Sequence, residues 1–263
     1  MKKLLRRDAW THKGENGRVL IVAGSEIYTG APYFNGMGAW RTGVDLVHLV
    51  GHRRAMDCTA FQAPELITHP LKGELKRSDV PLILKLAEEA DVVLLGGGLA
   101  RNKETHAALA VLIQKIKAPL VCDAEALHVF KKGLSKNPSI LLTPHAGEFL
   151  TLTGEWISID IKDRKAKTQQ WAKKLGATIL LKGHIDVISD GTITRLNTTG
   201  TPTMSKGGTG DVLAGLCAGF IAQGFSCFDA AYQAARINGL AGEKASKLHG
   251  SGFRIEEILD EIM

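Results

Sequence analysis

The sequence predicts an α/β protein, a three-layer αβα sandwich with a mostly parallel central sheet and an antiparallel hairpin at its edge. Three observations support this prediction. Short apolar runs alternate with amphipathic stretches along the chain. The runs are continuously apolar, which is typical of strands covered by helices on both faces. One further segment, residues 186–197, places an Asp-Gly turn between two β-prone stretches and so predicts a hairpin.

The apolar runs and the amphipathic stretches give the expected elements in chain order. Strands are expected at residues 19–22, 44–50, 92–95, 120–122, 140–142 and 179–181. Helices are expected at about residues 31–41, 78–90, 105–115, 161–175, 211–223 and 228–247. No internal repeat, low-complexity tract or linker interrupts this alternation. We therefore expect residues 1–263 to form a single domain.

Composition and charge narrow the classes of partner. Of the 263 residues 44% are hydrophobic and 23% are charged, and the formal net charge is +6. Basic pairs such as Arg53 and Arg54 are scattered, so an anionic small molecule is expected rather than nucleic acid. No segment approaches the roughly 18 apolar residues that span a bilayer, so no membrane partner is expected. The basic start at residues 1–7 has no apolar stretch after it, so we expect a cytoplasmic protein.

The strongest local signal is the segment Ser-Lys-Gly-Gly-Thr-Gly-Asp at residues 205–211, directly before a helix-like stretch. Its glycines permit a tight turn whose main-chain N–H groups, with the positive end of the helix dipole, can bind an anion. Asp211 in such a place could act as a general base toward a hydroxyl that attacks a phosphoryl group. Alternatively, Asp211 is simply the N-cap of the helix.

Polar residues also follow two of the expected strands. His145 and Glu148 come after the strand at 140–142, where α/β sheets bind ligands, and Glu148 could instead complement a helix dipole. No further ligands accompany them, and the four cysteines form no Cys-x-x-Cys pair, so no protein metal site is expected. Lys182 follows the strand at 179–181 and could contact the phosphate or ring of a nucleotide. An isolated lysine at the end of a strand is, however, more commonly exposed to solvent.

Two glycine-rich turns follow early strands, at residues 23–32 and 96–101. The first lacks the Gly-Lys-Ser/Thr ending of a Walker loop, and the second lacks the third glycine of the dinucleotide fingerprint. They are either ordinary strand-to-helix turns or places where a bulky ligand approaches the main chain closely.

Together these stretches resemble the ADP- or ATP-dependent NAD(P)H-hydrate dehydratases, the carbohydrate-kinase-like branch of the ribokinase superfamily. The resemblance covers nearly the whole chain, and the ordered combination of Tyr-Thr-Gly-Ala-Pro-Tyr-Phe with Pro-Glu-Leu-Ile-Thr-His-Pro makes it specific. The matching segments are residues 13–24, 28–34, 64–70, 96–100, 143–148, 182–186 and 207–215. One departure is that the family usually reads Gly-Pro-Gly-Leu-Gly where this chain has Gly-Gly-Gly-Leu-Ala at residues 96–100.

The resemblance implies a ribokinase-like fold and a metabolite-repair reaction. ATP or ADP would phosphorylate the ring hydroxyl of hydrated NADH or NADPH (NADHX or NADPHX), phosphate would then leave, and Mg²⁺ would neutralise the nucleotide phosphates. The substrate would contact Ala31, Gly98, His145 and Asp211, with Asp211 as the catalytic base. The adenine nucleotide would contact Lys182, Gly183, His184, Ile185, Asp186, Gly207, Gly208, Thr209 and Gly210. A homo-oligomer is also expected.

Two other functions remain open from the sequence. A kinase of the same superfamily, acting on a vitamin precursor, would share the glycine-aspartate segment, because the fold alone does not fix the substrate. A non-catalytic adenine-nucleotide sensor could be built on the same scaffold, although Asp211 would then have no chemical role. A stable phosphorylated product would indicate the kinase, and nucleotide binding without turnover would indicate the sensor.

Overall fold

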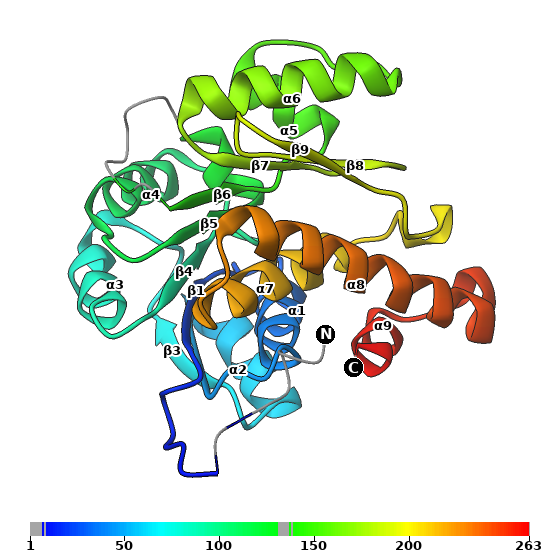
Figure 1. Cartoon of the computed structure of the whole chain (residues 1–263). Helices are drawn as coiled ribbons and strands as arrows, with labels where there is room; N and C mark the ends of the chain where they lie inside the picture. Colours follow the sequence, from blue (N-terminus) through cyan, green and yellow to red (C-terminus); the bar gives the residue numbers. More distant parts are fainter. Residues whose placement is uncertain (1–6, 8, 131–136, 138, 263) are drawn as a thin grey trace.

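The computed structural model describes residues 7, 9–130, 137 and 139–262 and contains a nine-stranded sheet between two layers of helices (Figure 1). This arrangement confirms the three-layer sandwich predicted from the sequence. Most of the N-terminal segment on which the cytoplasmic expectation rests lies outside the described residues. The single-domain organisation stays a prediction.

The sheet has the strand order β3-β2-β1-β4-β5-β6-β7-β8-β9. Its strands are β1 (Arg18–Val22), β2 (Leu46–His52), β3 (Ile67–Leu71), β4 (Val92–Leu95), β5 (Leu120–Cys122), β6 (Ile140–Leu142), β7 (Thr178–Leu181), β8 (Asp186–Ser189) and β9 (Thr194–Asn197). Neighbours from β3 to β7 are parallel, whereas β8 is antiparallel to both β7 and β9. The mostly parallel sheet and the edge hairpin are both confirmed.

The helices alternate with the strands. They are α1 (Gly30–Trp40), α2 (Arg53–Gln62), α3 (Val80–Ala87), α4 (Lys103–Lys115), α5 (Ala146–Thr153), α6 (Ile161–Leu175), α7 (Thr209–Ala222), α8 (Cys227–His249) and α9 (Ile255–Glu261). All six predicted helices are present, α6 with the predicted bounds and the other five with shifted ends, and α2, α5 and α9 are additional to them.

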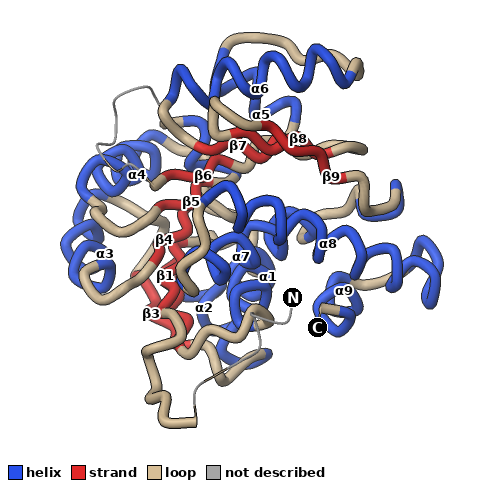
Figure 2. The backbone as a smooth tube through the Cα atoms, viewed as in Figure 1, coloured by secondary structure: helices blue, strands red, loops and turns tan. Residues whose placement is uncertain are grey.

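Alternate side chains of each central strand enter two separate cores. In β1, Val19 and Ile21 pack toward the layer of α1, α2, α7, α8 and α9, whereas Leu20 and Val22 pack toward α3, α4 and α6. The two layers are visible on either side of the strands in Figure 2. Burial on both faces explains why the strands read as continuous apolar runs.

Strand β3 was not predicted because its sequence, Ile-Thr-His-Pro-Leu, contains a proline and buries only Leu71. It is the outermost strand of the sheet, beside β2. An edge strand tolerates Pro70 because one side of its backbone has no ladder partner.

Helices α1 and α7 lie against each other at backbone contact distance. A Cβ on Gly215 would overlap the main-chain oxygen of Asn35, and a Cβ on Gly38 would lie 2.5 Å from the oxygen of Val212. Glycine at these two positions therefore permits the contact. The N-terminus of α7 is thereby fixed over the first turns of α1.

The chain changes direction within the sheet between β1 and β4. It runs outward from β1 through β2 to β3 and then returns to form β4 on the other side of β1. Open α/β sheets bind ligands at such a switch point, outside the carboxyl ends of the strands. The loops after β1 and β4 are therefore the expected floor of a binding site.

No helix in the part of the chain that the structure describes is long and apolar enough to cross a membrane.

Candidate active site

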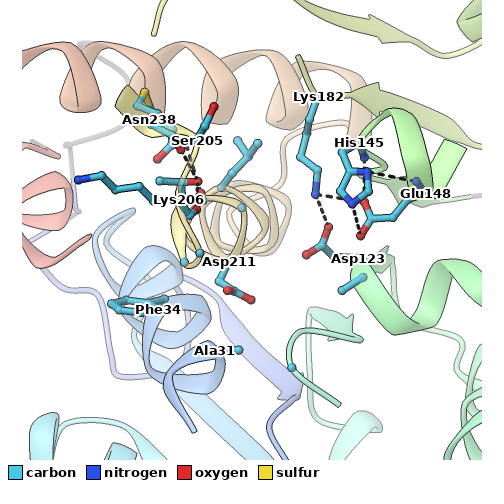
Figure 3. A pocket seen from close by; sticks show the side chains of 18 of the residues that line it. Ala31, Phe34, Asp123, His145, Glu148, Lys182, Ser205, Lys206, Asp211 and Asn238 are labelled. Atoms are coloured by element: carbon cyan, nitrogen blue, oxygen red, sulfur yellow. Dashed lines mark hydrogen bonds and ion pairs between the residues drawn. The ribbon is translucent and has the colours of Figure 1, made fainter. Parts of the chain in front are cut away.

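A cavity of about 1410 Å³ lies at the carboxyl ends of the central strands. Twelve of the thirteen site residues predicted from the sequence line it, and Ile185 is the exception. The cavity is bounded by the loops after β1, β4, β5 and β7 and by the first turn of α7. Figure 3 shows the side chains of some of the residues that line it. The structure thus brings together predicted site residues that are up to 180 positions apart, from Ala31 to Asp211.

A largely buried lysine and two carboxylates lie on one side of this cavity. Lys182 Nζ donates to Asp123 Oδ1 at 2.9 Å and lies 3.6 Å from Glu148 Oε2. Asp123 Oδ1 also accepts from Thr143 Oγ1 at 2.6 Å. Burial lowers the pKa of Lys182, but the facing carboxylates outweigh burial and raise it well above its ordinary value. Lys182 is therefore a fixed cation, not the solvated lysine that was the commoner expectation.

His145 and Glu148 hold the start of α5. His145 Nδ1 accepts from the main-chain N–H groups of Gly147 and Glu148, and Glu148 Oε2 accepts from the His145 N–H at 2.8 Å. This is a reciprocal capping arrangement, so both residues have a structural role that the sequence suggested only for Glu148. The His145 side chain remains 60% exposed toward the cavity and can still contact a ligand.

Asp211 is not the N-cap of α7. The helix begins at Thr209, and Gly208, with φ +104°, is the cap residue. Gly210 and Asp211 occupy the first turn, where main-chain N–H groups have no helical acceptor and can bind an anion. The alternative interpretation of Asp211 as a helix cap is therefore wrong, because Asp211 lies two residues beyond the helix start.

The Asp211 carboxylate faces the same cavity as Lys182 and Asp123 (Figure 3). Burial raises the pKa of Asp211 to about 7, and the charges of Asp123 and Glu148 act in the same direction while Lys182 opposes them. No hydrogen bond from a described residue stabilises the charged form. A carboxylate with a pKa near neutrality is a stronger base than an ordinary one and suits proton abstraction.

Ala31 and Gly98 meet across the switch point. Gly98 has φ +62°, and a Cβ there would lie 2.7 Å from the Cβ of Ala31 and 3.1 Å from that of Tyr28. Gly98 is therefore required both by its backbone conformation and by the close approach of α1. These two predicted substrate residues form the part of the cavity that lies beside β1 and β4.

The predicted nucleotide residues fall in two loops. Residues 182–185 form the turn between β7 and β8, and Asp186 is the first residue of β8, where its Oδ1 accepts from the Gly183 N–H at 2.9 Å. Residues 207–210 form the cap and first turn of α7. A Cβ on Gly210 would have only Lys182 Nζ near it, at 3.6 Å, so the two loops meet at this point.

Several lining residues were missed by the sequence analysis. Asp123 follows β5 directly, as Lys182 follows β7, so the same signal would have found it. Arg101 pairs with buried Glu125 at 3.2 Å on the β4 and β5 side. Lys206 Nζ donates to the main-chain oxygens of Ser251 and Phe253 and ties the glycine-rich loop to the segment before α9. Arg101 and Lys206 belong to the glycine-rich segments 96–101 and 205–211 but were given no role there, and Asp123 lies outside both segments.

Away from the cavity, Glu26, His52 and Glu74 bring possible ligand atoms within 4.8 Å of one another. They lie on the loops after β1 and β3 and at the end of β2. They are not among the residues that line the cavity.

A protein-family model described as NAD(P)H-hydrate dehydratase matches residues 19–263. The ADP-dependent (S)-NAD(P)H-hydrate dehydratase of Cenarchaeum symbiosum is 40% identical over 264 residues, which cover 98% of this chain and 91% of that protein. The bifunctional NAD(P)H-hydrate repair enzyme Nnr of Pyrobaculum aerophilum is 39% identical over 259 residues, 97% of this chain and 52% of that protein. The chain thus spans about half the length of such bifunctional relatives.

Among solved structures, the ADP/ATP-dependent NAD(P)H-hydrate dehydratase of Bacillus subtilis, co-crystallised with ATP and Mg²⁺, superposes with a TM-score of 0.84. It is 27% identical, and the match covers 98% of this chain and 91% of that one.

Proposed function

This chain belongs to the NAD(P)H-hydrate dehydratase family and has its ribokinase-like fold, and we propose that it uses ADP or ATP to dehydrate NADHX or NADPHX. The observation that supports this best is the Asp211 carboxylate, which faces the cavity from the anion-binding first turn of α7 with its pKa raised to about 7. A base and an anion site side by side suit the transfer of a phosphoryl group to a hydroxyl.

The first step makes a leaving group. Asp211 takes the proton of the ring hydroxyl, the hydroxyl oxygen attacks the terminal phosphorus of the nucleotide, and the bond to the nucleotide's bridging oxygen breaks. The N–H groups of the first turn of α7 and the Lys182 ammonium, which line the same cavity, would stabilise the charge that builds up on the phosphoryl oxygens. The nucleotide leaves one phosphate shorter.

The second step restores the ring. The carbon–oxygen bond breaks with release of phosphate, assisted by the lone pair of the ring nitrogen. A proton then passes from the neighbouring carbon to water, and its bonding pair forms the ring double bond. The product is NADH or NADPH. Ala31 and Gly98, at the switch point, would hold the nicotinamide end, while residues 182–186 and 207–210 would hold the adenine nucleotide.

Mg²⁺ fits the charge balance of the cavity. The negative charges of Asp123 and Glu148 raise the pKa of Asp211 there, and Lys182 is the positive charge that interacts with all three carboxylates. The excess of carboxylate oxygens suits a hard divalent cation, which uses one or two carboxylates together with substrate phosphates. Glu148 and Asp123 would hold Mg²⁺ with the nucleotide, and the bound ion would neutralise charge on the transferring group.

The direct test is to mix the protein with hydrated NADH and Mg²⁺, then with ATP or with ADP, and to follow the absorbance of the reduced nicotinamide and the release of free phosphate. Both signals should rise together with at least one of the nucleotides. A stable phosphorylated product without recovered NADH would identify a kinase, and nucleotide binding with neither signal would identify a sensor.

Gly210→Val should weaken ATP binding at least tenfold, because the new side chain would project toward Lys182 into the space proposed for the phosphates. Isothermal titration calorimetry with ATP and Mg²⁺ measures this. Gly73→Val is the matched control, because Gly73 also has open space around it but does not line the cavity. Equal affinity of Gly210→Val and the parent would place the nucleotide elsewhere.

His145→Asn should raise the KM for hydrated NADH several-fold while leaving ATP affinity near that of the parent. Asparagine is a strong N-cap, so this change removes the exposed ring but keeps the start of α5. Steady-state kinetics with each substrate varied in turn separates the two effects. A loss of ATP affinity with an unchanged KM for the hydrate would assign His145 to the nucleotide.

The cytoplasmic location and the homo-oligomer remain proposals. The described cysteines, Cys58, Cys122, Cys217 and Cys227, are all unpaired, which suits a reducing compartment. Light scattering coupled to size-exclusion chromatography would give the number of subunits.

A further inference from the structure

Asn35 connects α1 to the catalytic end of α7. Its side chain is fully buried, and Nδ2 donates to the main-chain oxygen of Asp211 at 2.8 Å. Its other polar atom, Oδ1, is buried and has no hydrogen-bond partner among the described residues. A buried amide oxygen without a donor is costly, so a donor is expected to face it in some state of the protein.

The unpartnered oxygen and the Asp211 carboxylate converge on the same point. A Cβ built on Gly97 would overlap Asn35 Oδ1 and would lie 2.9 Å from Asp211 Oδ1. Gly97 is the position at which the related family usually has proline, so the missing side chain leaves room for this pair of oxygens. Asn35 Oδ1 has no donor among the residues that the structure describes, and a protonated Asp211 carboxyl would supply one at this point.

The charges around Asp211 favour such a proton. Asp123 after β5 and Glu148 in α5 both disfavour the ionised carboxylate, and Lys182 after β7 favours it. With burial added, the pKa of Asp211 lies at about 7, so both forms exist near neutral pH. The amide oxygen of Asn35 would repel the ionised form and accept a hydrogen bond from the protonated form.

We propose that Asn35 is a positioning residue for Asp211, holding its main chain through Nδ2 and accepting the carboxyl proton through Oδ1. In the reaction, which rests on the proposed function above, this oxygen would stabilise Asp211 after it has taken the proton of the ring hydroxyl. This hydrogen bond would also raise the pKa of Asp211 above the value set by burial and by the neighbouring carboxylates, which makes Asp211 a stronger base. Asn35 does not touch the reacting atoms.

The test is the titration of Asp211 itself, followed by carbon-13 NMR of the side-chain carboxyl in protein without substrate or nucleotide. The Asp211 signal is identified by its absence from the spectrum of Asp211→Asn. In Asn35→Leu, which keeps the volume but removes both polar atoms, the midpoint should fall by about one pH unit. The methyl group of Gly97→Ala would push the two oxygens apart, so the titration midpoint of Asp211 should fall in this variant too.

Asn238→Leu is the matched control. Asn238 is also buried with an unpartnered Oδ1, and its Nδ2 contacts the same helix turn through the oxygen of Thr209 at 3.4 Å. Its loss should leave the Asp211 midpoint unchanged. An unchanged or raised midpoint in Asn35→Leu overturns the proposal, as does an equal fall in Asn238→Leu. If Asn35→Leu does not fold, Gly97→Ala takes its place in the test: a lowered Asp211 midpoint supports the proposal, and an unchanged or raised midpoint overturns it.

Activity is a separate readout. The acid limb of the kcat/KM profile for hydrated NADH should move to lower pH in Asn35→Leu, with kcat reduced because the base is weaker and less well held. A shifted NMR midpoint in a protein that never dehydrates the hydrate would keep the assignment of Asn35 and reject the dehydratase function. Failure of the Asn35 proposal and failure of the proposed dehydratase function can thus be told apart.

Discussion

Replacing Asp211 with Asn should lower the turnover of hydrated NADH by about a hundredfold or more, because a positioned general base contributes roughly 10² to 10⁴ in rate. Asparagine has the same shape but cannot take the hydroxyl proton. Nucleotide affinity should stay equal or increase, since the carboxylate no longer repels the phosphates. The measurements are steady-state release of NADH and calorimetric binding of ATP.

The same variant should be at least as stable as the parent. Because the folded protein binds the Asp211 proton more tightly than the unfolded chain does, ionisation of Asp211 costs stability as pH rises from about 4 through about 7. Asparagine avoids this cost. The melting temperature of Asp211→Asn should therefore exceed that of the parent at pH 8, and the difference should shrink at pH 5.

Asp160→Asn provides the control for a purely structural aspartate. Asp160 is the N-cap of α6 and accepts from the Lys162 N–H at 3.1 Å, so asparagine should replace it with little change in stability or turnover. If Asp211→Asn behaved like this control, with turnover within a few-fold of the parent, Asp211 would be structural and the base would be another group.

Lys182→Met should lower the free energy of unfolding by about 3 kcal/mol or more, because it leaves the buried Asp123 and the largely buried Glu148 without their counter-charge. It should also move the acid limb of the pH–rate profile to higher pH, since Lys182 now holds the pKa of Asp211 down. The variant should also bind ATP more weakly, because it lacks the positive charge proposed to face the nucleotide phosphates. Urea unfolding at pH 7, the pH–rate profile and calorimetry measure the three effects.

Lys244→Met is the comparison for this change. Lys244 Nζ pairs with Glu261 at 2.6 Å, but its side chain is 54% exposed, so its loss should cost less than about 1 kcal/mol. Equal destabilisation by the two variants would mean that the Lys182 cluster is solvated like a surface pair. An unmoved acid limb in Lys182→Met would separate Lys182 from the titration of Asp211.

The fold could be predicted where burial on both faces left continuous apolar runs, as in β1, β4 and β7. It could not where an element is half-exposed. Helix α2 buries only Ala55, Met56 and Thr59, and β3 buries only Leu71, so neither has a strong period. The cap of α7 was missed because Gly208 serves there through its backbone conformation, without a side chain.

The site could be predicted where residues follow strands in recognisable motifs, as Lys182 and His145 do. Asp123 gives the same kind of signal, since it follows β5 directly, but it belongs to no motif considered from the sequence. Asn35 gives none. It lies within α1, and its significance depends on a helix that begins 174 positions later in the chain. Only the packing of α1 on α7 reveals it.

That packing has a consequence for synthesis of the protein. Strand β1 and helix α1 are complete by residue 40, but α7, which covers them and supplies Asp211, ends at residue 222. While the chain emerges from the ribosome, one face of the growing sheet therefore stays uncovered until most of the protein has been made. Contacts so distant in sequence form slowly and leave apolar surface available to other chains in the meantime. We expect this face of the sheet to become covered only once α7 has been made, so that Asp211 reaches the site together with the helix that completes this part of the core.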